Sequence, residues 1–483
     1  MRLVSGRAGM GFVVVGCAVA LLWVGVPIAA ARTGYVVSGP PSSAPSSSSA
    51  LTPFDTTSGA VGTPTTLTGG ATQVAITPDG KTAYVTNYNN DTVTSVDLAT
   101  GAAGTPIAVD QPPSYYGVTA IAITPDGSTA YVTDLYEDAI SPIDLATGTV
   151  GNPIPLGGNV GNGPEGIAIT PDGTTAYVTA SNFDTVTPVD LTTGKPLTPI
   201  SLCPSNVRCY ERAVVVTPDG KTAYVASSNN DEVTPIDVAT NTAGTPIAVP
   251  GSSYAMAITP DGQTLYMSDF TNDTVDPIDV ATGTVGTPIP VPGGVGPIAI
   301  TPDGTTAYVS GSSEVTPIDL ATGTARTPIS IPTPYWIAIT PNQGPTAAFT
   351  STAANAGSAS SFDGSGSADP DGTVASYAWN FGDGSAATTT TTTPTVTHTY
   401  TTPGTYTVTL TVTDNEGCSD TQIFTGQTMS CNGTSAAQVS HTVTVASTTK
   451  KHCRQWWRCP PPRRHHRPPP PPRHRRGWWW RWW

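Results

Sequence analysis

The chain has 483 residues, of which 49 are glycine and 48 are proline, while only 11% are charged and 7% are aromatic. This composition argues against long helices and coiled coils. The formal net charge is −14, and residues 32–449 hold all 34 acids but only 7 of the 20 Lys and Arg residues. Such an acidic body argues against nucleic acid as a partner, because neutralising phosphates needs a basic face.

Residues 1–31 have the three parts of a secretory signal. Arg2 and Arg7 precede an apolar stretch, residues 10–28, which ends in alanines up to Ala31. This order predicts export with cleavage near Ala31. A transmembrane anchor is the alternative, because the apolar stretch is close to the minimum span.

Removal of that segment leaves six of the seven cysteines, and they fall into three close pairs. An even number in local pairs predicts disulfides formed outside the cytosol. Zinc is the alternative, but zinc sites use tighter spacings with histidine partners. The predicted disulfides are Cys203–Cys209, Cys418–Cys431 and Cys453–Cys459.

An internal repeat is the strongest signal in the chain. TPDG occurs six times from Pro78 to Pro302, and TPNQ adds a seventh position at Pro341, at intervals of 39 to 47 residues. Each unit reads as four short strands rich in Val, Ile, Thr and Tyr, separated by TPDG and TG turns. Four-stranded units of this length predict a β-propeller.

The fragments outside the six complete units are complementary. Residues 335–340 supply only a first strand, residues 34–38 match a second strand, and residues 52–67 match the third and fourth strands. A Ser-rich loop, residues 40–50, interrupts them. One C-terminal and three N-terminal strands would then build a seventh blade and remove the exposed sheet edges. The sequence therefore predicts an all-β fold with a closed seven-bladed propeller over residues 32–344.

The stretch ITPDGKTAYVTNYNNDTVTSVDLATG, residues 76–101, resembles the YVTN-family β-propeller repeat of exported bacterial and archaeal surface-layer proteins. The resemblance implies a secreted, extracellular or cell-surface location in a bacterium or archaeon. What it implies about activity is weak, because one fold hosts many functions.

Different signals follow, over residues 345–447. Apolar and polar residues alternate in TYTVTLTVT, residues 405–413, and Trp379 with Phe381 would fill a sandwich core. The sequences FDGSGSADPDG and SYAWNFGDG resemble the PKD domain, a small Ig-like β-sandwich. That resemblance implies a role in spacing, adhesion or weak contact with carbohydrate or protein.

Residues 448–483 form a Pro-, Arg- and Trp-rich cationic tail that we expect to be disordered. Proline at this density favours an extended spacer. Five of the last six residues are tryptophan. Trp favours the membrane interface and Arg favours anionic headgroups, so we expect residues 450–483 to tether the protein to an anionic membrane or wall polymer. Docking of the tail on the acidic body is one alternative, and stacking on single-stranded nucleic acid, which export disfavours, is another.

No catalytic motif is found in the propeller. Residues 32–344 contain no histidine, since all six lie from His398 onward, and no GxSxG, HExxH or Walker sequence occurs. The kinds of chemistry that remain open to the propeller are carboxylate catalysis and Ca²⁺ binding. No other cofactor is expected. The Asp residues that repeat in the turns of every blade are expected to hold those turns. Weak Ca²⁺ candidates lie in the PKD-like loops: Asp363, Asp369, Asp371 and Asp383.

Function is expected where the blades differ. The TPDG and TG turns are uniform and lie on one face of a propeller, so the opposite face carries the variation. The position five residues before the Thr of each TPDG should line the channel mouth; it holds Thr72, Thr119, Glu165, Arg212, Tyr254, Gly296 and Tyr335. The candidate ligand-binding residues, whose aromatic rings and carboxylates suit sugars or peptides, are Tyr115, Tyr116, Asp134, Tyr136, Glu165, Tyr210, Arg212, Tyr254, Asp269 and Tyr335.

Two classes of function fit these features. The first is an exported, non-enzymatic adhesion or binding protein whose propeller contacts a cell-envelope glycan or protein, with the PKD-like domain as a spacer. The alternative is a secreted lactonase- or lyase-type enzyme that uses carboxylates or Ca²⁺ in the channel. The absence of histidine and the near identity of the blades favour the first class.

Overall fold

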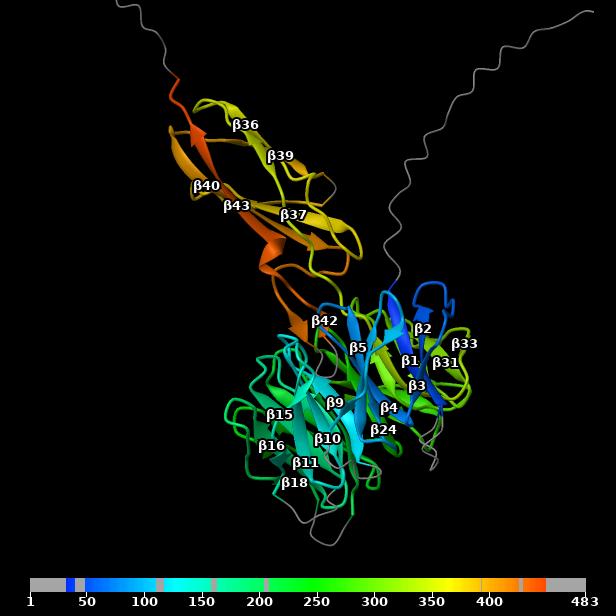
Figure 1. Cartoon of the computed structure of the whole chain (residues 1–483). Coiled ribbons are helices and arrows are strands. Elements are labelled where there is room, and N and C mark those ends of the chain that lie inside the picture. Colours follow the sequence, from blue (N-terminus) through cyan, green and yellow to red (C-terminus); the bar gives the residue numbers. More distant parts are fainter. Residues whose placement is uncertain are drawn as a thin grey trace, which may run out of the picture.

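The computed structural model describes residues 32–39, 48–109, 117–157, 163–203, 208–391, 393–424 and 429–448. Their strands build a ring of seven sheets and a separate sandwich beside it (Figure 1). Within these ranges no helix is long and apolar enough to cross a membrane. The predicted signal segment, the cationic tail and the Cys453–Cys459 pair lie outside the described residues.

Six blades have the same antiparallel pattern. Blade one contains β4 (Ala71–Ile76), β5 (Thr82–Asn87), β6 (Thr92–Asp97), β7 (Ala102–Ala103) and β8 (Ile107–Ala108). Blades two to six follow: β9 (Val118–Ile123), β10 (Thr129–Asp134), β11 (Ala139–Asp144), β12 (Thr149–Val150), β13 (Ile154–Pro155); β14 (Pro164–Ile169), β15 (Thr175–Ala180), β16 (Thr185–Asp190), β17 (Lys195–Pro196), β18 (Ile200–Ser201); β19 (Glu211–Val216), β20 (Thr222–Ser227), β21 (Glu232–Asp237), β22 (Thr242–Ala243), β23 (Ile247–Ala248); β24 (Ser253–Ile258), β25 (Thr264–Asp269), β26 (Thr274–Asp279), β27 (Thr284–Val285), β28 (Ile289–Pro290); β29 (Ile298–Ile300), β30 (Thr306–Ser310), β31 (Glu314–Asp319), β32 (Thr324–Ala325) and β33 (Ile329–Ser330).

The expected fourth strand is split into two short pieces in each of these six blades. In blade one, both β7 and β8 pair with β6, and the Gly104 amide between them donates to the Ser95 carbonyl at 2.8 Å. Pro106, which directly precedes β8, has no N–H that could donate to a neighbouring strand. A short, proline-interrupted outer strand protects the sheet edge against pairing with another chain.

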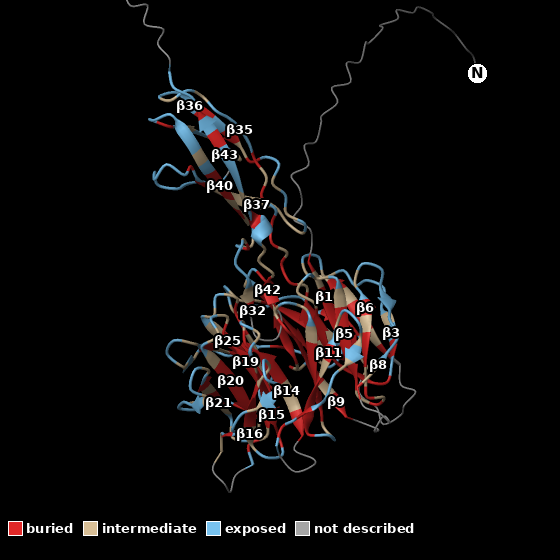
Figure 2. Cartoon of the chain, turned by 60° about the vertical axis from the view of Figure 1, so that its left-hand side comes forward, coloured by how far each residue is buried: buried red, intermediate tan, exposed pale blue. Residues whose placement is uncertain are grey.

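The hydrophobic core lies between neighbouring blades. One cluster joins Ala75 and Tyr84 of blade one to Ile121, Val132 and Ile143 of blade two. Figure 2 shows that buried residues dominate the inner strands of the ring and that exposed residues lie on its outside. Each blade thus covers an apolar face that it could not bury alone, which is why the repeats must close.

The seventh blade is made from the two ends of the propeller sequence, as predicted. Its strand order is β3 (Thr65–Thr68), β2 (Ser48–Asp55), β1 (Thr33–Ser38) and β34 (Pro334–Ile339). One boundary differs from the prediction, because β2 begins at Ser48, inside the segment expected to be a loop. Ala50 pairs with Ser38, and the buried Ser49 hydroxyl accepts the Ala71 amide at 3.0 Å. These contacts draw the serine-rich sequence into the sheet.

The repeated turn acids hold their own turns. In blade one, the Thr77 hydroxyl and the Lys81 amide both donate to Asp79 Oδ1, at 2.6 and 3.1 Å. At the next turn the Thr100 hydroxyl donates to Asp97 and lowers the pKa of that carboxyl. The TPDG turns and the TG turns define one face of the ring, called the TPDG face below, and the face opposite is called the variable face.

The second body is a two-sheet sandwich with a stapled hairpin. Trp379 is fully buried at its centre and meets the Phe349 ring edge to face at 5.2 Å. The predicted disulfide Cys418–Cys431 is present and links β42 of the hairpin to the segment that follows β40. The sheets contain β35 (Thr350–Thr352), β36 (Ala359–Asp363) and β39 (Thr395–Thr399); β38 (Thr388–Thr390), β37 (Val374–Asn380), β40 (Gly404–Asp414) and β43 (Gln438–Val445); the hairpin is β41 (Ile423–Phe424) and β42 (Met429–Cys431), followed by the 3-10 turn η1 (Ser435–Ala437).

The sandwich rests on the TPDG face of the ring. The Gln343 side-chain amide donates to the carbonyl of Pro78, and that of Gln422 donates to the carbonyl of Pro125. Both prolines belong to TPDG turns. Figures 1 and 2 show the sandwich and the β42 hairpin on this side of the ring only. The variable face is left uncovered by the sandwich.

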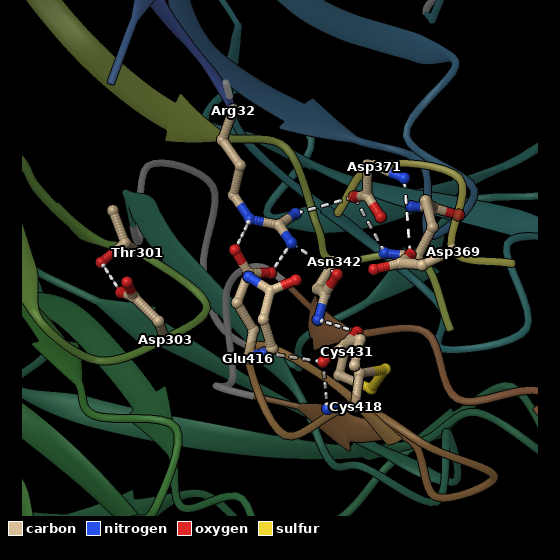
Figure 3. A network of polar contacts seen from close by, with 12 residues as sticks. Arg32, Thr301, Asp303, Asn342, Asp369, Asp371, Glu416, Cys418 and Cys431 are labelled. Carbon is tan, nitrogen blue, oxygen red and sulfur yellow. Dashed lines mark hydrogen bonds and ion pairs between the residues drawn. A yellow bond between two sulfur atoms is a disulfide. The ribbon is translucent and has the colours of Figure 1, made fainter. Parts of the chain in front are cut away.

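Arg32 joins the two bodies. Its guanidinium pairs with Asp371 and Glu416 of the sandwich and donates to Asn342, which lies between the two bodies (Figure 3). The Arg32 side chain is only 6% exposed. Asn342 in turn donates to Asp414 at 2.7 Å. The junction is therefore a buried, charged contact between the bodies.

Candidate functional site

One cavity opens in the ring on the variable face. Its volume is about 340 Å³. Six of the seven predicted channel-mouth positions line it: Thr72, Thr119, Glu165, Arg212, Tyr254 and Tyr335. The seventh, Gly296, has no side chain and is not part of the lining.

A β-bulge at the start of the inner strand brings these residues to the cavity. In β19, Glu211 pairs with Ser227 and Ala213 pairs with Ala226, so Arg212 is the extra residue. Tyr254 and Tyr335 hold the same place in β24 and β34. A bulged residue leaves the regular alternation of the strand and its side chain is re-aimed. The fold thus presents one variable side chain per blade to a common space.

Threonines of the second strands fix these bulges. The Thr179 hydroxyl accepts the Gly166 amide at 2.8 Å and donates to the Arg212 carbonyl of the next blade at 3.2 Å. Thr86 makes the matching bonds to Gln73 and Thr119. The Thr of the repeated YVT sequence therefore satisfies the buried polar groups of the bulged backbone and connects adjacent blades along the cavity wall.

The charged and aromatic groups of the cavity contact one another. Glu165 lies 3.8 Å from Arg212 and accepts the Ser181 hydroxyl at 3.0 Å. The Arg212 guanidinium lies over the Tyr254 ring, 5.7 Å from its centroid. Burial, together with a hydrogen bond to Tyr254, raises the pKa of Tyr335 well above its ordinary value. Tyr335 is therefore a phenol, able to donate a hydrogen bond, across the physiological pH range.

Two predicted acids lie outside the cavity lining. Asp134 is 1% exposed and accepts the amides of Tyr136 and Glu137 at 2.9 and 3.2 Å. Asp269 is fully buried and binds the turn after β25 in the same way. Both carboxylates hold the turn that follows a second strand, because an Asp side chain there can reach the backbone two residues on.

The predicted tyrosines are spread over the variable face. Tyr136 is half exposed and follows the cavity-lining Leu135. Tyr210 has a left-handed backbone, and its amide donates to Asp184 of the preceding blade. Tyr115 and Tyr116 lie outside the described residues. The sequence analysis also missed two aromatic residues of the lining, Tyr88 and Trp336. Trp336 could not be distinguished from the ordinary core of a strand, and Tyr88 follows a second strand at a position that was not singled out in this blade.

Glu211 is a buried acid that the sequence did not single out. Its side chain is fully buried behind the predicted disulfide Cys203–Cys209, which is present. Burial, reinforced by the charge of Asp184, raises the pKa of Glu211 to about 7. Glu211 and the two cysteines form the one cluster with metal-ligand spacing among the described residues, but the disulfide occupies both sulfur atoms.

Replacing Glu211 by glutamine should remove a pH dependence of stability. The folded-state pKa of about 7 exceeds the ordinary value of 4.5. The folded state therefore holds the Glu211 proton more tightly than the unfolded state does. The resulting contribution to stability is complete below pH ~4.5 and is lost as the pH rises towards 7. We expect the free energy of unfolding of Glu211→Gln to exceed that of the wild type by up to about 3 kcal/mol at pH 8. At pH ~4.5 the two free energies should differ little. Urea unfolding at both pH values measures this, and equal differences at both would contradict it. The exposed Glu137→Gln is the control, with an effect within about 0.5 kcal/mol.

The four Ca²⁺ candidates of the sandwich lie in two settings. Asp363 accepts the Ser365 amide, and Asp383 contacts Ser385 and His398, so both hold loops of the sandwich. Asp371 pairs with Arg32 at the junction. Burial and the nearby Asp371 raise the pKa of Asp369 to about 7. Calcium binding by these residues stays a prediction.

Comparison with known families agrees with this architecture. The model of the PKD domain matches residues 342–428, and a model described as "Lactonase, 7-bladed beta-propeller" matches residues 47–249. Ring and sandwich together define a two-part, all-β repeat protein. The chain therefore contains a seven-bladed β-propeller followed by a PKD domain, and the YVTN-type resemblance of its repeats is consistent with both matches.

Solved structures show similar folds. The chain resembles a functionally unknown protein from Desulfotomaculum acetoxidans DSM 771, with 19% identity, 64% of this chain and 98% of that chain covered, and a TM-score of 0.50. Two further matches have lower TM-scores. Hydrazine synthase of Kuenenia stuttgartiensis is 22% identical, with 55% of this chain and 88% of that chain covered and a TM-score of 0.48. Virginiamycin B lyase of Staphylococcus aureus is 16% identical, with 52% and 82% covered and a TM-score of 0.46. At these identities the first likeness supports the fold, and none of the three bears on activity. A comparison with curated proteins finds no significant match.

Proposed function

We propose that this is an exported cell-surface or extracellular binding protein whose propeller cavity takes part of a glycan or a peptide. The observation that carries the proposal is the cavity lining, in which three tyrosines, a tryptophan and the Glu165–Arg212 pair come from five different blades around one space. Aromatic faces with a few convergent polar groups are the usual composition of a ligand pocket. The pair offers both an acceptor and a charged donor to hydroxyl or amide groups.

The PKD domain supports the propeller in this proposal. It contacts the TPDG face through Gln343, Gln422 and Arg32, so the cavity on the opposite face stays accessible. The predicted tether, residues 450–483, lies outside the described residues. In the full protein we expect it to hold the PKD end at an anionic envelope polymer or membrane and to leave the variable face turned outward.

Substitutions in the cavity test the proposal. We expect Glu165→Gln to weaken ligand binding about tenfold, because a charged hydrogen-bond partner contributes about 1.5 kcal/mol or more. Glycan arrays and peptide libraries on the full-length protein identify ligands, and calorimetry on each hit measures the affinity. Lys221→Met is the matched control, since Lys221 is an exposed charge beside a TPDG turn. Hits that bind the two variants equally well would contradict a ligand site in the cavity.

The lactonase-type match over residues 47–249 favours a second candidate function, hydrolysis or lyase chemistry in the same cavity. Glu165 is the acidic residue of the cavity lining and would be the general base. Turnover of a lactone panel, with and without added Ca²⁺, distinguishes the two functions. Turnover that Glu165→Gln abolishes would support the enzyme, and absence of turnover together with Glu165-dependent binding would support the binding protein.

A further inference from the structure

Three exposed aromatic residues lie on the variable face, in turns next to the cavity. Among the described residues, five large hydrophobic side chains are more than 40% exposed, and three of these are aromatic: Tyr136 (50%), Phe183 (47%) and Phe270 (65%). Each lies in the turn that joins the second and third strands of its blade, in blades two, three and five. We call these three residues the aromatic collar.

The collar is continuous with the cavity. Tyr136 follows Leu135, which lines the cavity. The turn of Phe183 contains Ser181, whose hydroxyl donates to Glu165. The Phe270 ring lies 6.3 Å from the ring of the cavity-lining Tyr254. The Phe270 ring therefore continues the aromatic surface of the cavity, and the turns that carry Tyr136 and Phe183 adjoin its lining.

The fold does not require aromatic residues at these positions. In blade four the corresponding turn contains only polar residues, Ser228, Asn229 and Asn230, and it joins β20 and β21 in the same way. The turn geometry depends instead on an aspartate with a left-handed backbone, such as Asp184 or Asp231, which precedes the third strand. Aromatic side chains left in water at tolerant positions are therefore candidates for ligand contact.

The chemistry around the collar favours a glycan over a protein. The rings stand one to a blade, with polar groups between them: Glu137, Asn182 and Asn272. A protein hot spot needs a contiguous, fully desolvated patch, which separated rings do not form. A sugar chain instead presents an apolar C–H face and several hydroxyls on every unit, which single rings and neighbouring amides can bind in turn.

Charge narrows the class of glycan. Among the described residues of the second-to-third-strand turns, acids such as Glu137, Asp184 and Asp231 occur and bases do not. The bases of the variable face are Arg208 and Arg212, and Arg212 is paired with Glu165. This surface would repel an anionic polymer.

We propose that the collar binds the continuing units of a neutral or amino-sugar glycan chain whose end occupies the cavity. The inference rests on the proposed function and adds a substrate class and an extended site to it. It makes affinity depend on chain length, because only longer chains reach from the cavity to Phe183 and Phe270.

Oligosaccharides of increasing length test the collar on the full-length protein. The probes are cello-, manno- and chito-oligosaccharides of two to six units, and the measurement is calorimetry. We expect the wild type to bind long chains more tightly than disaccharides. The double variant Phe183→Ala/Phe270→Ala should lose about tenfold in affinity for long chains and bind disaccharides unchanged. Leu197→Ala removes a similarly exposed apolar side chain, 41% exposed, outside these turns and should change nothing.

The outcomes separate the collar from the cavity. Wild-type affinity that is independent of chain length, or long-chain binding that the double variant retains, would overturn the collar and leave the cavity proposal standing. Absence of binding to every probe, with a peptide bound in its place, would overturn the glycan assignment of both. A loss by the Leu197 control equal to that of the double variant would also overturn the collar.

Discussion

Arg32→Met is expected to release the PKD domain from the propeller. The Arg32 guanidinium is almost fully buried between Asp371 and Glu416, and Asp414 lies one hydrogen bond further away. Removing the cation leaves these carboxylates uncompensated in a buried setting, which costs about 3 to 5 kcal/mol. Because the sandwich and the propeller have separate cores, both should stay folded while their contact is lost.

Two measurements check this. Small-angle X-ray scattering should give a larger radius of gyration for Arg32→Met, and calorimetry should resolve separate thermal transitions for the two domains. Arg326→Met is the control, because the Arg326–Asp319 pair is exposed on the propeller and contributes at most about 1 kcal/mol. An unchanged scattering profile for Arg32→Met would show that the junction does not depend on this cation.

Phe54→Ala is expected to destabilise the closing blade by about 3 to 5 kcal/mol. Phe54 is 1% exposed, and its ring lies 5.1 Å from that of Tyr308 in blade six. It also fills the space above Gly34, where even a Cβ atom would collide with the ring. The alanine leaves a cavity in the one blade that joins the two ends of the propeller. Because the free energy of unfolding of a native protein is usually only about 5 to 15 kcal/mol, this loss is a substantial fraction of it.

Urea unfolding followed by tryptophan fluorescence and circular dichroism measures this loss. Phe183→Ala is the matched control, since it removes the same side chain from an exposed position and should change stability by no more than about 0.5 kcal/mol. Equal effects of the two substitutions would contradict a closing role for Phe54. Tyr308, whose hydroxyl donates to the Thr56 carbonyl, is the partner to vary next.

Several features could be predicted from sequence because they are local or repeated. The spacing of the TPDG turns predicted the number and length of the blades. The incomplete units at residues 34–38 and 335–340 predicted that the ring closes. The turn role of Asp79 follows from side-chain geometry within a few residues. The channel-mouth positions, such as Arg212, followed from alignment of the blades, although the bulge that brings them to the cavity was not predicted.

Other features depend on contacts between distant segments. Nothing in the sequence distinguishes Arg32 from the other basic residues. Only the arrangement of the two domains places it between Asp371 and Glu416. Glu211 is one of many acids, and its raised pKa comes from burial beside a disulfide. The third strand of the closing blade starts at Ser48 because Ser49 finds a partner in the next blade.

By itself the sequence determined the all-β fold, the number of blades and the face on which they differ, because turns, strand propensity and repetition are properties of neighbouring residues. The tertiary structure decided which side chains meet in the cavity, which acids are buried and how the PKD domain is held on the TPDG face. These depend on solvent exclusion and on distances between residues hundreds of positions apart, such as Arg32 and Glu416, and no local pattern records them.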